Sequence, residues 1–285
     1  MQAIILCGGK GTRLASLYAD RPKVLVPIAG KPFLEWQLEW LARNGITDIH
    51  LAAGYKAEAI RQWMSQCGMR IADCGLPDMG QRSQDSEFRI PNSAIRITLS
   101  VETSPLGTAG GMKFVEPWIR SDPFLVVNGD TLLPNADAGF SSLRSLRTLR
   151  ESSADGEEGS RRGRGGRREG FAPPAAIAVT RIEEAGRYGT VEFAADGLIT
   201  AFREKASRNE GWVNGGVYLL RKSVLAKIAP GQNVSIETEV FPSLVRERGL
   251  LAFPCPPPLL DMGTPEGISK MDQWLTLPRS DPSPA

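Results

Sequence analysis

An apolar run that leads directly into a glycine-rich, basic loop is the feature that most constrains the fold of this chain. Ala3–Leu6 is continuously apolar, as in a strand that is buried on both faces. Glycines follow at positions 8, 9 and 11, and Arg13 and Lys23 then add positive charge. Glycines can turn several N–H groups toward one anion because they tolerate positive φ and carry no side chain. The pattern therefore predicts a phosphate site at the carboxyl end of a parallel strand.

This loop differs from the two best-known phosphate-binding loops. A Walker loop needs Gly-Lys followed by Ser or Thr, but Gly9-Lys10 is followed by Gly11. The dinucleotide fingerprint needs a further glycine where this chain has Leu14. A turn that merely joins a strand to a helix is the alternative, although such a turn has no need of two basic residues beside it.

Composition and net charge exclude several classes of protein. The chain has 285 residues, 41% of them hydrophobic, which suffices for one large core or for a core with a small subdomain. The net charge of +2 implies no general attraction for nucleic acid. The four cysteines lack metal-site spacing, and the sequence shows neither a secretory signal nor an apolar stretch of membrane length. We expect a soluble cytoplasmic protein that binds neither nucleic acid nor a membrane.

Strand and helix patterns alternate along the first half of the chain, and hairpin signals enter in the second half. Apolar runs predict strands at 2–7, 48–53, 95–101, 124–127, 175–180, 189–193, 198–203, 213–220 and 250–253. Helical spacing predicts helices at 31–43, 57–66, 107–115 and 236–246, and another that Thr264 caps. The predicted fold is a doubly wound α/β class with a mostly parallel sheet and a small antiparallel insertion.

We expect one domain over residues 1–277 and a frayed tail at 278–285. Within the domain, residues 69–93 are weakly patterned and predict a long loop. Residues 152–170 contain SRRGRGGRREG and predict a disordered insertion, because apolar residues are nearly absent. An RNA-binding arginine-glycine tract is the alternative reading of this insertion, but the tract is short and lacks aromatic residues.

Polar residues gather where the predicted strands end. Glu102, Asp130 and Asp261 each follow a strand, and Asn214 with two glycines interrupts another. Ligands of open α/β sheets bind outside the carboxyl ends of the strands. Asp130 and Asp261 could face one magnesium ion there, because Mg²⁺ is usually held by one or two carboxylates plus substrate phosphates. For each aspartate alone, a turn or a helix cap is the alternative role.

Taken together, these segments resemble the sugar-1-phosphate nucleotidyltransferases, also called nucleotide-sugar pyrophosphorylases. The signature of that family is Gly-Gly-x-Gly-Thr-Arg-Leu with a Pro-Lys about ten residues later, as at 8–14 and 22–23 here. ETSPLGTAGG at 102–111 resembles the segment of the family that binds the base, and VNGDT at 127–131 resembles its first metal-binding segment. REK at 203–205 resembles the sugar-phosphate segment, VNGGVYLL at 213–220 the sugar-binding strand, and DMGTPE at 261–266 the second metal-binding segment. The resemblance covers nearly the whole chain.

The resemblance implies a GT-A-like, Rossmann-like enzyme in which an oxygen of a sugar 1-phosphate attacks the α-phosphorus of a nucleoside triphosphate. The products would be an NDP-sugar and pyrophosphate. A phosphate monoester has a second pKa of about 6, so the nucleophile is already anionic at neutral pH. No general base is needed, and a chain with a single histidine can carry out this reaction.

The resemblance also implies a role for each matching residue. Arg13 and Lys23 would be catalytic, because they would stabilise the leaving pyrophosphate and bridge the phosphates of both substrates. Asp130 and Asp261 would hold Mg²⁺, the expected cofactor. The residues that would bind the nucleotide are Leu6, Gly8, Gly9, Gly11, Thr12, Gly107, Thr108 and Gly110. The residues that would bind the sugar phosphate are Glu102, Asn128, Glu204, Lys205, Asn214 and Gly215.

The substrates follow from finer similarity. Four segments together are most similar to D-glycero-D-manno-heptose 1-phosphate guanylyltransferases, which use GTP and make GDP-heptose for surface glycans. They are MQAIILCGG, KPFLEWQLEWL, RYGTV and VNGGVYLL. Mannose-1-phosphate guanylyltransferases and uridylyl- or thymidylyltransferases of other hexose 1-phosphates are the alternatives. Cys7 and Ala206 depart from the family pattern of alanine and proline, but neither change removes a charged group.

A non-catalytic, nucleotide-sensing relative is the alternative from another functional class. Such relatives typically lose the loop arginine, the lysine or a metal-binding aspartate, whereas this chain keeps Arg13, Lys23, Asp130 and Asp261. A homo-oligomer is an option that the sequence leaves open.

Overall fold

The computed structural model describes residues 1–9, 11, 14, 17–67, 72–73, 86–90, 93–136, 173–183, 185, 188–203 and 210–277. The insertion predicted at 152–170, most of the 69–93 stretch and the tail at 278–285 lie outside these residues. The prediction of one domain over 1–277 therefore stays a prediction.

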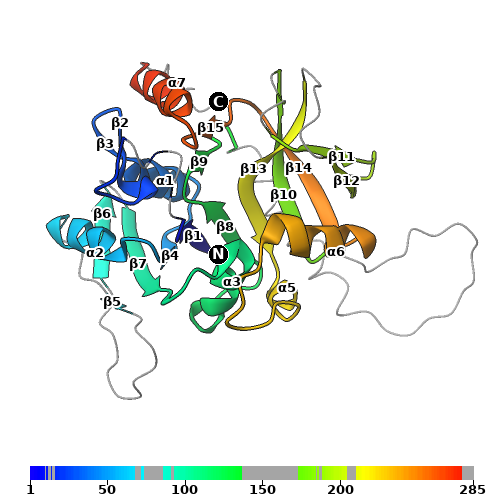
Figure 1. Ribbon diagram of the computed structural model, residues 1–285, viewed down its shortest axis with the longest axis horizontal. Coiled ribbons are helices and arrows are strands. Elements are labelled where there is room, and N and C mark those ends of the chain that lie inside the picture. Colours follow the sequence, from blue (N-terminus) through cyan, green and yellow to red (C-terminus); the bar gives the residue numbers. More distant parts are fainter. Residues whose placement is uncertain are drawn as a thin grey trace, which may run out of the picture.

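Four parallel strands form the centre of the fold (Figure 1). β1 (Gln2–Cys7) lies between β4 (Asp48–Ala53) and β8 (Phe124–Asn128), and β7 (Ser93–Val101) lies on the other side of β4. Because the order is β8-β1-β4-β7 and all three pairings are parallel, the four carboxyl ends share one edge. The glycine loop, Glu102 and the Asp130 turn all leave the sheet at this edge.

Antiparallel strands extend the sheet beyond β8, in the right half of Figure 1. β13 (Gly211–Leu220) pairs antiparallel with both β8 and β10 (Ala175–Ile182), and β14 (Leu250–Cys255) runs parallel to β10. The predicted hairpin forms from β11 (Thr190–Phe193) and β12 (Ile199–Arg203). The arrangement confirms the predicted α/β class with its antiparallel insertion.

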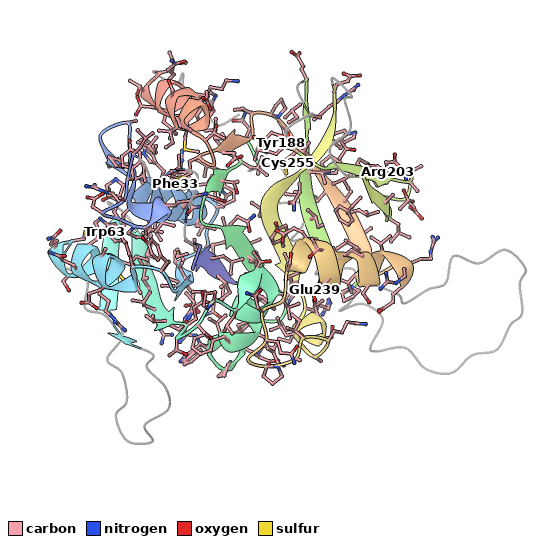
Figure 2. The ribbon with its side chains drawn as sticks, viewed as in Figure 1. Phe33, Trp63, Tyr188, Arg203, Glu239 and Cys255 are labelled. Carbon is pink, nitrogen blue, oxygen red and sulfur yellow. The ribbon has the colours of Figure 1, made fainter. Side chains whose placement is uncertain are left out.

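Alternate residues of the central strands enter two different hydrophobic cores. Ile4 and Ile5 are both completely buried. Ile5 packs with helices α1 (Phe33–Arg43) and α2 (Ala57–Gln66), whereas Ile4 packs with residues of α3 (Gly107–Phe114) and α6 (Phe241–Arg246). Phe33 and Trp63, labelled on α1 and α2 in Figure 2, belong to the first core. A strand buried on both faces reads as a continuous apolar run, which is why the sequence showed these strands clearly.

The remaining elements are short, except α7. They are η2 (Lys23–Leu25), β2 (Pro27–Ile28), β3 (Lys31–Pro32), β5 (Ala72–Asp73), β6 (Ser86–Ile90), η3 (Glu116–Trp118), β9 (Thr131–Leu132), α5 (Lys222–Leu225), η6 (Ile236–Val240), α6 (Phe241–Arg246), β15 (Leu260–Asp261) and α7 (Pro265–Thr276). Thr264 caps α7 as predicted, since its hydroxyl accepts a hydrogen bond from the Gly267 N–H at 3.1 Å.

Three predicted elements differ from the structure. The helix predicted from 31 begins only at Phe33, because Pro32 is extended and Lys31–Pro32 pairs with Pro27–Ile28. The helix predicted at 236–246 starts as a π-helix and becomes an α-helix at Phe241, next to a proline that cannot donate a helical hydrogen bond. The 69–93 stretch is not wholly a loop, because β5 and β6 pair with β7.

None of the helices in the described part of the chain is long and apolar enough to cross a bilayer.

Candidate active site

A cavity of about 520 Å³ opens where the central strands end. Its wall combines the carboxyl ends of β1, β4 and β8 with Glu102, part of α3 and residues of the 233–237 segment. Ten of the residues that the sequence assigned to substrates or metal line it: Leu6, Gly8, Gly9, Gly11, Lys23, Glu102, Gly107, Thr108, Asn128 and Asp130. Four others, Thr12, Arg13, Glu204 and Lys205, lie outside the described residues.

Lys23 crosses the glycine loop to reach Asp130. Its Nζ donates a hydrogen bond to Asp130 Oδ2 at 3.0 Å, and only about a fifth of the lysine side chain is exposed. Gly11 has φ +61°, and a Cβ at this position would lie 2.8 Å from Lys23 Cγ. A glycine is therefore needed here both for the backbone conformation and for the passage of the lysine side chain. Residues 107 positions apart thus form one ion pair in the cavity wall.

The turn that carries Asp130 is packed tightly against β1. The Gly129 N–H donates to Leu6 O at 3.0 Å, and a Cβ on Gly129 would lie 2.3 Å from that same oxygen. Below the turn, Gln37 of α1 is completely buried and donates from Nε2 to Asn128 O at 2.8 Å and Thr131 O at 3.0 Å. The position of Asp130 is therefore fixed by backbone contacts on both sides of its turn.

The backbone of Asp261 lies beside the backbone of Asp130. β15 pairs with β9 so that Asp261 is opposite Thr131, and the Met262 N–H donates to Asp130 O at 3.0 Å. The Asp261 carboxylate accepts from Gly263 N at 2.8 Å and from the Tyr188 hydroxyl at 3.2 Å. Burial, and then the negative charge of Asp130, raise the pKa of Asp261. The two predicted metal ligands are thus brought together, although Asp261 is not among the residues that line the cavity.

This pair of carboxylates fits a magnesium ion as part of its ligand set. Two acidic groups whose charges disfavour each other can both remain ionised when a divalent cation lies between them. No cluster of three or more His, Cys, Asp or Glu side chains suited to a metal occurs among the described residues. Mg²⁺ commonly takes one or two carboxylates and completes its shell with water and substrate phosphates.

Glu102 lies against the backbone of two glycines, Gly8 and Gly54, which directly follow strands β1 and β4. A Cβ would come within 2.8 Å of Glu102 Oε1 at Gly8 and within 2.5 Å at Gly54. The Glu102 N–H donates to Ala53 O, and Glu102 Oε2 accepts from the Leu106 N–H at 3.3 Å. Burial raises the pKa of the Glu102 carboxyl. An acceptor is therefore held at the entrance to the loop that opens α3.

The glycines of that loop pack against another segment. Gly107 has φ +71°, and a Cβ there would lie 2.5 Å from Val234 O. A Cβ on Gly110 would lie 2.3 Å from Gln232 O, and Gly110 is not among the cavity-lining residues. The Ala109 N–H donates to Val234 O at 2.9 Å. Close packing of α3 on residues 232–234 accounts for these glycines.

The two asparagines predicted to contact the sugar phosphate converge on one buried tyrosine. Asn128 Nδ2 and Asn214 Nδ2 donate to the Tyr218 hydroxyl at 3.2 and 3.1 Å. Gly215 and Gly216 let β13 approach its neighbours, since a Cβ would lie 2.5 Å from Leu133 Cδ1 and 2.2 Å from Thr131 Oγ1, respectively. Asn128 lines the cavity, whereas Asn214 and Gly215 do not. Asn214 is linked to Asn128 through the Tyr218 hydroxyl.

Sequence reasoning missed four residues of this site: Gln37, Tyr188, Tyr218 and Glu237. Each acts by a tertiary hydrogen bond to a residue far away in the chain. A faint signal exists for Gln37, which interrupts the apolar face of a helix with a polar side chain. Tyr188, which lies near β15 in Figure 2, belongs to the RYGTV segment, but that segment shows no chemistry by itself.

Comparison with known proteins shows the family of this chain. The family model described as nucleotidyl transferase matches residues 2–154 and 168–275. The D-glycero-α-D-manno-heptose 1-phosphate guanylyltransferase of Campylobacter jejuni is 32% identical over 83% of this chain and 83% of its own length. The mannose-1-phosphate guanyltransferase of Schizosaccharomyces pombe is 33% identical over 93% of this chain, which spans 62% of that protein.

A solved structure resembles this chain over nearly its whole length. The crystal structure of HddC from Yersinia pseudotuberculosis complexed with GMP-PN superposes with a TM-score of 0.67 at 26% identity. The match covers 96% of this chain and 99% of HddC. The chain therefore belongs to the nucleotidyl transferase family.

Proposed function

We propose that this protein transfers a guanylyl group from GTP to D-glycero-D-manno-heptose 1-phosphate, which releases pyrophosphate and forms GDP-heptose. The observation that carries the proposal is the cavity at the strand ends, where the Lys23–Asp130 ion pair faces the glycine loop. Similarity to the Campylobacter jejuni guanylyltransferase supports the choice of both substrates.

Bringing two polyanions together is the main physical difficulty of this reaction. Lys23 Nζ has further N–H donors beyond the one that it gives to Asp130, and these can bind phosphate oxygens of both substrates. The N–H groups of Gly8, Gly9 and Gly11 can add an anion-binding surface beside it. Arg13 would meet the charge that develops on the pyrophosphate, as its place in the signature implies.

Asp130 and Asp261 are the residues that would hold Mg²⁺. When bound, the ion supplies charge neutralisation at the α-phosphate and a template for in-line attack. The protein contributes the position of the two carboxylates, which the Gly129 turn and the β9–β15 pairing hold side by side. Both polyanions then approach a site whose own negative charge is compensated.

Glu102 is our candidate for reading the base. Guanine presents an N1–H and an exocyclic amino group on one edge, and a carboxylate accepts from both, whereas adenine presents an acceptor at N1. The Glu102 carboxylate lies at the opening of the nucleotide loop, held by the Leu106 N–H. This assignment moves Glu102 from the sugar phosphate, where the sequence resemblance put it, to the base.

Mannose 1-phosphate is the second candidate acceptor. The similarity to the Schizosaccharomyces pombe mannose-1-phosphate guanyltransferase extends over 93% of this chain at nearly the same identity. Both sugars have a manno-configured ring, and they differ in the extra carbon of the heptose. Hydrogen bonds between Asn128 and the ring hydroxyls would therefore bind either sugar.

A pyrophosphate-release assay tests the proposal. Purified protein is offered four nucleoside triphosphates, each with heptose, mannose or glucose 1-phosphate, with Mg²⁺ and with a chelator. We expect the highest kcat/KM for GTP with heptose 1-phosphate, and no turnover without the metal. The Glu102→Gln variant should lose at least about tenfold of its preference for GTP over ATP. A protein that binds nucleotide but releases no pyrophosphate from any pair would support a non-catalytic relative instead.

A further inference from the structure

Glu237 is a carboxylate in the cavity wall that the reaction itself does not require. It belongs to the π-helical turn η6 and lines the cavity beside Thr108. No ion pair is recorded for it among the described residues, and its hydrogen-bond partners there are hydroxyl groups. Single π-helical turns often mark functional positions. The question is what this carboxylate holds.

Glu237 joins the nucleotide loop to the strand that carries the sugar-side residues. Glu237 Oε2 accepts from the Thr108 hydroxyl at 3.1 Å, and Thr108 belongs to the first turn of α3. Glu237 Oε1 accepts from the Tyr218 hydroxyl at 3.4 Å, and Tyr218 belongs to β13. Ser235 also donates to Oε2 at 3.1 Å, which fixes the carboxylate in this orientation. Helix α3, the η6 turn and β13 come together near the middle of Figure 1.

The hydroxyl protons of Thr108 and Tyr218 are both donated to Glu237. The Thr108 oxygen donates to Glu237 and accepts from the Ile236 N–H at 2.8 Å, so its proton is not available to a nucleotide. The Tyr218 oxygen donates to Glu237 and accepts from the amides of Asn128 and Asn214. A continuous chain of hydrogen bonds therefore runs from the nucleotide loop to the two asparagines.

The nucleotide loop has few ways to move without disturbing this chain. It is docked on the segment that leads into η6, through the Val234 N–H to Leu106 O at 2.9 Å and Asn233 Nδ2 to Pro105 O at 3.1 Å. A shift of the loop when nucleotide binds would therefore move this segment and Glu237 with it. Because Tyr218 is completely buried, its hydroxyl can follow only with its two asparagine partners.

We infer that Glu237 is a positioning residue that couples the nucleotide site to the sugar-phosphate site, through Thr108 on one side and Tyr218 on the other. Binding of either substrate then orders the site of the other, which is a reciprocal coupling between two sites. The inference rests on the proposed function, since it takes the two substrates from there.

The test measures substrate binding without turnover. Titration calorimetry gives the Kd of a GTP analogue with a methylene group between the α- and β-phosphates, in the presence of Mg²⁺. The titration is repeated with saturating heptose 1-phosphate, and the ratio of the two Kd values is the coupling factor. We expect a factor of at least about 5 for the wild-type protein and below about 2 for Glu237→Gln.

Two further variants separate coupling from direct contact. Thr108→Val keeps the shape of the side chain but removes the hydroxyl on the nucleotide side, and it should also bring the factor below about 2. Glu239→Gln is the matched control, because Glu239 lies on the same turn, is exposed and does not line the cavity (Figure 2). It should keep the wild-type factor. Thermal unfolding checks the fold of each variant. Should Glu237→Gln fail to fold, the coupling factor of Thr108→Val decides the test.

Several results would overturn the inference. One is a wild-type factor near 1 although both substrates bind, and another is an unchanged factor in Glu237→Gln or in folded Thr108→Val. A loss of heptose 1-phosphate affinity with the coupling factor intact would make Glu237 a direct sugar ligand instead. Wild-type protein that binds neither the analogue nor the sugar phosphate would contradict the proposed function itself.

Discussion

Gln37 lies wholly inside the protein, although its side chain is a polar amide. Both of its amide N–H groups are used, because they donate to the carbonyls of Asn128 and Thr131 on either side of Asp130. Two hydrogen bonds from one buried amide nitrogen hold the backbone carbonyls that they reach in place. At the scale of single residues, the turn that carries Asp130 is thus held by the side chain of a helix residue.

Replacing Gln37 tests this support. Gln37→Leu leaves two carbonyls without this donor and should lower the free energy of unfolding by about 2 kcal/mol. Urea denaturation measures the loss. Gln62→Leu, an exposed change on α2, should shift the free energy of unfolding by less than about 0.5 kcal/mol. Equal effects of the two substitutions would show that Gln37 gives the turn no special support.

His50 is the only histidine, and it is held in its neutral form in the sheet. Its ring nitrogens lie 2.7 Å from Thr98 Oγ1 and 2.9 Å from Ser100 Oγ, and its ring stacks on Trp118. Burial, and then the charge of Arg120, lower the pKa of His50 to about 4. The unfolded chain therefore binds a proton between about pH 6.5 and pH 4 that the folded chain does not, so stability falls as the pH falls through this window.

The expected size of this effect is about 2 kcal/mol between pH 7 and pH 5. His50→Gln should lose this part of the pH dependence, because an amide keeps hydrogen-bonding capacity but does not titrate. Unfolding free energies of both proteins at the two pH values give the comparison. Parallel losses in the wild type and the variant would exclude His50 as the source.

At the scale of elements, glycines determine how closely the strands and turns of the site approach one another. Gly129 allows the turn after β8 to rest on Leu6 O of β1, and Gly216 allows β13 to rest on Thr131 of β9. Both contacts lie below the 3.0 Å that a Cβ would need. At these two positions the absence of a side chain lets one element pack closely on another.

Gly129→Ala should therefore damage both the fold and the site. The added methyl group meets a backbone oxygen 2.3 Å away, so the turn must move, at a cost of about 1–3 kcal/mol in stability. Displacing Asp130 should also lower kcat. Gly9→Ala is the control for stability, since a Cβ there meets no atom of the described residues within 4 Å, and it should melt near the wild-type temperature. A Gly129→Ala protein with wild-type melting and kcat would show that the contact is not tight.

At the scale of the whole molecule, the sequence predicted β1, β4 and β8 well because these strands are buried on both faces. Continuous apolar runs such as Gln2–Cys7 and Asp48–Ala53 have the same bounds in the structure as in the prediction. The β6 strand was missed because edge pairing uses backbone hydrogen bonds, which leave no apolar pattern to read. The two-stranded pairing of Lys31–Pro32 was missed for a similar reason.

The site was predictable as far as it depends on charged groups at strand ends. Asp130 and Asp261 could be assigned because each follows a predicted strand, and Lys23 because it belongs to the Pro-Lys of the family signature. Tyr218 and Glu237 could not be assigned, because their roles arise only when β13 and η6 meet in space. Tertiary hydrogen bonds between residues with no shared motif have no signature in a single sequence.

Asp130 is the residue on which the central claim depends, because it joins the lysine, the second aspartate and the cavity. The most direct test incubates GTP, heptose 1-phosphate and Mg²⁺ with wild-type protein or with Asp130→Asn, and follows GDP-heptose and pyrophosphate by ³¹P NMR. Asp272→Asn, an exposed change on α7, is the control. We predict GDP-heptose formation by the wild type and the control, and a rate at least about 100-fold lower for a fully folded Asp130→Asn. Wild-type rates in the Asp130→Asn protein, or no GDP-heptose from the wild type, would contradict the account.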